Sequence, residues 1–271
     1  MPPEGSRRSP SALTAFLACL LTLLFTAALT AASDPSLIGL ARIGDGVHPA
    51  LPADVADAPL AQPEPAPSGV GGYRLLELQD DGSTQPVRWD PCRPIHYVLR
   101  PDGAPPGGAL AIREAIASVE RVTGLRFSFD GETRETPRRD RPTVDVHRYG
   151  SRWSPVLVAW TDPEEYPAMA GYAGLGGPDT VAGRTPGHRR YVTGVVLLNR
   201  RHLSDVVGWE DGQARLNSVV LHEFGHLIGL DHVADQTQLM YKQPVAHANG
   251  FEDGDRRGLA LLSDGPCFRD F

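Results

Sequence analysis

The run from His222 to His232 constrains this chain more than any other feature, because it places three histidines and one glutamate in the pattern HExxHxxGxxH. Residues i and i+4 of a helix share one face, with Cβ atoms roughly 5–6 Å apart, so His222 and His226 can reach one metal ion. Glu223 lies beside them, where it can act on a water at that metal. Gly229 is a residue type that ends helices in a left-handed conformation, which lets the chain turn back and bring in His232. This spacing predicts a zinc site with three protein ligands and one open position.

A second signal is Met240, which stands eight residues after His232 in the run Gln-Leu-Met-Tyr. Taken alone, Met240 would be an ordinary core methionine. Together, the histidine motif and the methionine resemble the metzincin zinc metalloproteases, and the eight-residue step resembles the matrixins (the M10-type peptidases) in a bacterial single-domain form. The resemblance implies that Met240 forms a hydrophobic base beneath the zinc ligands. It also implies a substrate-pocket wall made of Tyr241, Lys242, Gln243 and Pro244.

Two positions depart from the matrixin pattern. Val233 stands where a small polar residue usually follows the third histidine, and Lys242 stands where proline usually follows the Met-Tyr pair. Neither position touches the metal chemistry. Both weaken any transfer of substrate preference from the family.

The function that this resemblance implies is zinc-dependent endopeptidase activity, in which a zinc-activated water attacks a peptide bond and Glu223 is the general base. Two other classes stay open: a catalytically silent, zinc-bound binding module on the cell surface, and a structural domain with a closed zinc site. The intact Glu223 argues against the first. The second would need a fourth ligand, and no further Cys or His stands at suitable local spacing.

The amino terminus indicates export. Arg7 and Arg8 precede an apolar run from Ala12 to Ala32, and Thr30 and Ala32 suit a signal-peptidase site. Residues 1–32 are therefore predicted to be a cleaved signal peptide. The run of about twenty residues could also span a bilayer as an uncleaved anchor. Either form places the rest of the chain outside the membrane, secreted or surface-tethered.

Residues 33–72 are rich in Pro, Ala, Gly and Asp, and are predicted to be a disordered linker or a short propeptide. Residues 73–271 form the predicted catalytic domain. Cys92 and Cys267 lie near its two ends, and an even pair in an exported protein suggests a disulfide. Cys92 as an inhibitory zinc ligand is the alternative. The net charge of −7 argues against nucleic acid as a partner. We also expect a monomer, and the resemblance implies protein or peptide substrates.

The hydrophobic periodicity of residues 73–271 predicts a mixed α+β domain, in which a twisted sheet packs on the zinc helix and a C-terminal helix follows. Strands are expected at 74–78, 95–99, 125–129, 143–147, 156–160 and 191–199, and helices at 107–123, 213–230 and 253–262.

The glycine-rich segment 170–177 resembles the region where matrixins expose an edge strand that binds peptides. Gly171, Tyr172 and Ala173 are therefore candidate pocket residues. A flexible loop is the equally open alternative. Calcium binding is possible but has no clear motif. The available side chains are those of His147, Asp162, Asp179 and His188. Their spacing does not match the family pattern, and each is expected to lie in a solvated loop.

Overall fold

The computed structural model describes residues 49, 53–69, 71–243 and 250–269. The chain divides into two units, residues 1–39 and 40–271, and every described residue lies in the second. The predicted signal segment 1–32 therefore lies outside the described residues, as does Pro244. No helix in the described part of the chain is long and apolar enough to cross a membrane.

Five strands form the central sheet in the order β3-β2-β4-β6-β5. The pairs β3–β2, β2–β4 and β4–β6 are parallel, whereas β5 pairs with β6 antiparallel and is an edge strand. A separate two-stranded sheet joins β1 to β7. The strands are β1 (Arg74–Leu75), β2 (Ile95–Arg100), β3 (Phe127–Glu132), β4 (Val156–Thr161), β5 (Gly174–Ala182), β6 (Arg189–Asn199) and β7 (Leu230–Asp231).

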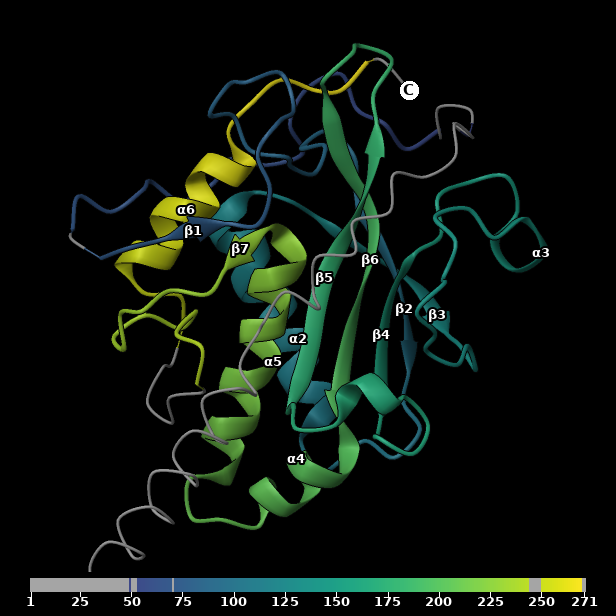
Figure 1. Cartoon of the computed structure of the whole chain (residues 1–271), viewed down its shortest axis with the longest axis vertical. Coiled ribbons are helices and arrows are strands. Elements are labelled where there is room, and N and C mark those ends of the chain that lie inside the picture. Colours follow the sequence, from purple (N-terminus) through teal and green to yellow (C-terminus); the bar gives the residue numbers. More distant parts are fainter. Residues whose placement is uncertain (1–48, 50–52, 70, 244–249, 270–271) are drawn as a thin grey trace, which may run out of the picture. The chain divides into compact units, whose positions relative to one another are not determined.

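Helices α2 and α5 pack against each other and, with the sheet, enclose the main core (Figure 1). The helices are α2 (Gly108–Thr123), α3 (Val146–Tyr149), α4 (Arg200–Val207), α5 (Gly212–Ile228) and α6 (Asp253–Ser263), with a short 3₁₀ turn at Pro167–Met169. The fold is therefore the predicted mixed arrangement of a sheet packed on the histidine-bearing helix.

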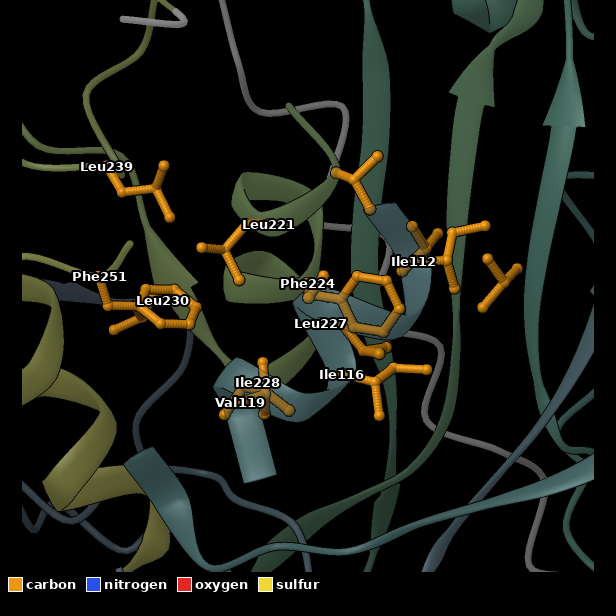
Figure 2. Packing of buried hydrophobic residues seen from close by; sticks show 14 of the residues in the cluster. Ile112, Ile116, Val119, Leu221, Phe224, Leu227, Ile228, Leu230, Leu239 and Phe251 are labelled. Carbon is orange, nitrogen blue, oxygen red and sulfur yellow. The ribbon is translucent and has the colours of Figure 1, made fainter. Parts of the chain in front are cut away.

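Both faces of the sheet are covered at β4. All six β4 residues are buried. Val158 and Trp160 face the main core, while Leu157 and Ala159 face a smaller cluster on the other side, as the period of two in a strand requires. In the main core, Phe224 and its neighbours on α5 interdigitate with Ile112 and Ile116 of α2 (Figure 2).

Three predicted elements differ from the structure. The expected strand at 143–147 is wrong, because Asp145 instead caps α3, its Oδ1 accepting a hydrogen bond from the Arg148 N–H at 3.1 Å. The strand expected at 125–129 is shifted to β3, and only the first two residues of the strand expected at 74–78 form β1. Helix α4 was not predicted. Its start is fixed by the Asn199 side chain, which caps the His202 N–H.

The described part of the predicted linker is attached to the domain. The N–H groups of Ala56 and Leu60 donate to the carbonyls of Cys92 and Pro91, at 2.8 and 2.9 Å. The Glu64 carboxylate pairs with guanidinium groups of α2 and α6, those of Arg121 and Arg256. The expectation of a disordered spacer is therefore corrected for residues 53–69, because these contacts hold the segment along the domain surface.

Cys92 and Cys267 form the predicted disulfide, with their Cα atoms 5.4 Å apart. This bond excludes the alternative in which Cys92 caps the zinc, because its sulfur is already engaged.

Candidate metal centre and active site

Helix α5 carries the first two histidines and the glutamate, and it ends at Ile228, two residues before the predicted end. Gly229 is its C-cap, with φ 121°, and its N–H donates to the carbonyls of Gly225 and His226. This positive φ suits glycine, because a side chain would be strained there. The chain then enters β7 and returns His232 to the helix.

The three imidazoles converge on one point. His232 Nε2 lies 3.1 Å from both His222 Nε2 and His226 Nε2. Tetrahedral zinc with Zn–N bonds of about 2.0–2.1 Å would separate its nitrogen ligands by roughly 3.3 Å, so these positions suit one zinc ion.

Hydrogen bonds fix which ring nitrogen of His222 and of His226 is free to bind a metal. His222 Nδ1 donates to the Leu239 carbonyl and His226 Nδ1 to the Leu230 carbonyl, each at 2.8 Å. Each neutral ring carries one N–H, so Nε2 of both presents a lone pair toward the shared point. Facing lone pairs repel unless a cation lies between them, which is a second indication that the donor set fits a metal.

Burial keeps these rings neutral. It lowers the pKa of His222 to about 4, lowers that of His226 well below its ordinary value, and lowers that of His232. Neutral imidazole is the form that binds metal, so no proton needs to be displaced from these sites near neutral pH.

Glu223 is buried beside the histidines, with 6% of its surface exposed. Burial raises the pKa of its carboxyl to about 8, although a hydrogen bond from the Gly176 backbone acts in the opposite direction. A carboxyl group with a pKa near the working pH can both accept and release a proton.

The edge strand β5 passes directly over Glu223. A Cβ on Gly174 would lie 2.6 Å from Glu223 Cγ, and one on Gly176 would collide with the Glu223 backbone. These two glycines were not among the predicted site residues. The signal for them was the Gly-Leu-Gly-Gly run itself, since glycine in a strand often marks close approach of another backbone.

The predicted pocket residues of the 170–177 segment lie in the turn before β5. Tyr172 packs against the sheet face away from the main core, whereas Ala173 packs against the main core. A Cβ on Gly171 would meet nothing within 4 Å, so the chain is not crowded there. The structure therefore does not bring Tyr172 to the histidines, and Gly174 and Gly176 make the close approach instead.

Met240 packs against the histidine-bearing helix α5 at Gly225. It is 1% exposed, and a Cβ on Gly225 would lie 2.5 Å from its Sδ. Tyr241 follows it, half-buried, and bridges to Val233.

Asp255 of α6 holds the methionine turn and was missed in the sequence. Its carboxylate accepts hydrogen bonds from the N–H groups of Leu239 and Met240 at 2.8 and 3.3 Å. Burial raises the pKa of Asp255 to about 6. No local pattern links residue 255 to residue 239, so only the capping-box acid at the start of α6 could have drawn attention to it.

The side chains considered for calcium do not gather in the described part of the chain. There, the groups that could hold a metal are the three histidines and the trio Asp90, Cys92 and Cys267, whose cysteines are bonded to each other. The expectation that Asp162 is a solvated loop residue is wrong. Asp162 is 1% exposed and its Oδ2 is held by Arg200 and Arg201 at 2.7 and 3.1 Å.

A comparison with protein families agrees with this geometry. Residues 159–262, which run from β4 to the end of α6, match the family model of the matrixins. No curated protein matches the chain. Among solved structures, the chain is similar to high choriolytic enzyme 1, a hatching enzyme zinc-protease from the medaka fish Oryzias latipes, with 12% identity and a TM-score of 0.34 over 62% of this chain and 88% of that one. The segment matched by the family model contains every residue of the converging histidine site, and this chain therefore carries a matrixin-like zinc metalloprotease domain.

Proposed function

We propose that this chain is an exported or surface-tethered zinc endopeptidase with Glu223 as its general base. The observation that carries the proposal is the convergence of three Nε2 atoms beside one buried carboxyl group. Among the described residues no fourth protein ligand joins the three histidines. A bound zinc would therefore keep the open position typical of catalytic sites.

Zinc held there would supply Lewis acidity, polarising the scissile carbonyl and lowering the pKa of a water molecule toward about 7. Glu223 takes the proton of the attacking water and then passes it to the leaving amine. Its burial strengthens this role, because a desolvated carboxylate holds a proton more tightly than an exposed one.

The edge strand β5 suits an extended peptide substrate. It pairs with β6 along one side and lies at the edge of the sheet. Its residues Gly174 and Gly176 lie close to Glu223. A peptide that adds to such an edge forms main-chain hydrogen bonds along its length, with side chains entering alternate pockets. This arrangement supports cleavage within a chain rather than at its end.

Export is supported by two features. The disulfide between Cys92 and Cys267 suits an oxidising compartment. The basic residues and apolar run of the first 32 positions suit a signal peptide or an anchor.

Hydrolysis of a mixed quenched-fluorescent peptide library by the full-length chain tests the proposal, with and without a zinc chelator. Glu223→Gln should keep zinc and lose about 10²–10⁴-fold in rate. Glu210→Gln, on an exposed residue, is the matched control and should cleave like the wild type. A folded, zinc-loaded wild type that cleaves no peptide would contradict the proposal and favour a binding module.

A further inference from the structure

The third histidine is anchored differently from the other two. His222 and His226 each donate Nδ1–H to a backbone carbonyl. His232 Nδ1 is buried and has no hydrogen-bond partner among the described residues. The position of the His232 ring therefore depends on the backbone on which it stands.

That backbone is held on one side by the methionine turn, where the Val233 N–H donates to the Met240 carbonyl at 3.0 Å. On the other side it is held by β1, a strand far away in sequence. Arg74 and Leu75 pair antiparallel with Asp231 and Leu230. The Leu76 N–H extends this contact by donating to the Gly229 carbonyl at 2.8 Å.

A side-chain pair completes the attachment. Arg74 Nη2 lies 3.1 Å from Asp231 Oδ2, while Asp231 Oδ1 accepts the His232 N–H at 2.7 Å. One carboxylate thus joins Arg74 to the backbone of the third ligand. The Arg74 side chain is 70% exposed, so this pair adds little to overall stability. Its larger effect would be on the positions of Asp231 and the His232 backbone.

We infer that Arg74 and Asp231 are positioning residues that hold His232 in register with the other two ligands. This inference rests on the proposed zinc site. Pairing with β1 fixes the backbone position of the 229–231 segment. Arg74 fixes the orientation of the Asp231 carboxylate, which accepts the hydrogen bond from the His232 N–H. Outer partners of metal ligands commonly affect affinity by about 10–100-fold, because a misplaced ligand must be reordered when the metal binds.

Zinc affinity of the full-length chain, measured by competition with a chromogenic chelator, tests the inference without using activity. Arg74→Ala should weaken zinc binding about tenfold, and Asp231→Ala about 10–100-fold, because it also removes the acceptor of the His232 N–H. Arg74→Lys should recover part of the loss. The double variant should bind no more weakly than Asp231→Ala, because both changes break the same connection.

Arg121→Ala is the matched control. Arg121 is also largely exposed and pairs with Glu64 of the amino-terminal segment at 2.8 Å, away from the histidines. Its zinc affinity should equal that of the wild type, and all zinc-free variants should unfold at similar temperatures. If Arg74→Ala and Asp231→Ala bind zinc as tightly as Arg121→Ala, the inference is overturned while the proposed function stands. A wild type that binds no zinc would overturn both.

Discussion

Substituting Gly174 by alanine is the sharpest test of how β5 and Glu223 fit together. The added Cβ would lie 2.6 Å from Glu223 Cγ and 2.7 Å from its Oε1. Carbon atoms prefer separations of about 3.5–4.0 Å, so either the carboxyl group or the strand must move by about 0.9 Å. Glu223 is buried and its backbone is fixed in α5, which leaves the side chain little space in which to yield.

A displacement of about 1 Å at a reacting group can cost about 10²-fold in rate, which corresponds to about 2.7 kcal/mol in the activation free energy. We therefore expect Gly174→Ala to lower kcat/KM by about 10²-fold, mainly through kcat, with zinc content unchanged because no ligand is touched.

Initial rates with a cleaved peptide, alongside zinc stoichiometry and thermal unfolding, measure this effect. Gly72→Ala is the control, since its Cβ would meet nothing within 4 Å and the backbone there is not left-handed. A Gly174→Ala enzyme with wild-type kcat would refute the argument that the strand fixes the Glu223 carboxyl group. Equal losses in both variants would show that the effect is not local.

Three other changes have defined outcomes. Replacing Cys92 and Cys267 by serine opens a link between residues 175 apart in sequence and should lower the free energy of unfolding by up to about 5 kcal/mol, measured by urea denaturation; an unchanged midpoint would contradict this. In zinc-free protein, His222 has a folded pKa of about 4 against 6.5 unfolded, so the unfolded chain binds more protons in between and stability rises with pH across that window, by up to about 3 kcal/mol. His222→Gln should remove that share of the slope in urea titrations at pH 4.5 and 7, and an identical slope would exclude it. Arg141→Met leaves the buried Glu135 carboxylate without its cation and should cost about 3–5 kcal/mol by thermal unfolding, with partial recovery on adding Glu135→Gln; no recovery would show that packing, not charge, was lost.

Much of the fold was predictable from local pattern. The apolar run at 156–160 and the helical spacing at 107–123 predicted β4 and α2 to within one or two residues. A strand buried on both faces leaves a continuous apolar run, whereas a helix buried on one face leaves apolar residues three or four positions apart. The strand expected at 143–147 is wrong although its residues do alternate. The Asp145 side chain accepts a backbone N–H hydrogen bond in a helical turn, and this local bond replaces pairing with another strand.

The sequence by itself determined the chemistry of the site. Helical geometry brings His222 and His226 to one face, Gly229 permits the turn, and His232 follows at a fixed distance along the chain. Only the tertiary structure decided what surrounds these ligands: the glycines of β5 over Glu223, Asp255 under the methionine turn, and Arg74 beside Asp231. The physical reason is that backbone periodicity acts over a few residues and is written in local sequence. Pairing between distant segments depends on how the whole core packs, and no local pattern records it.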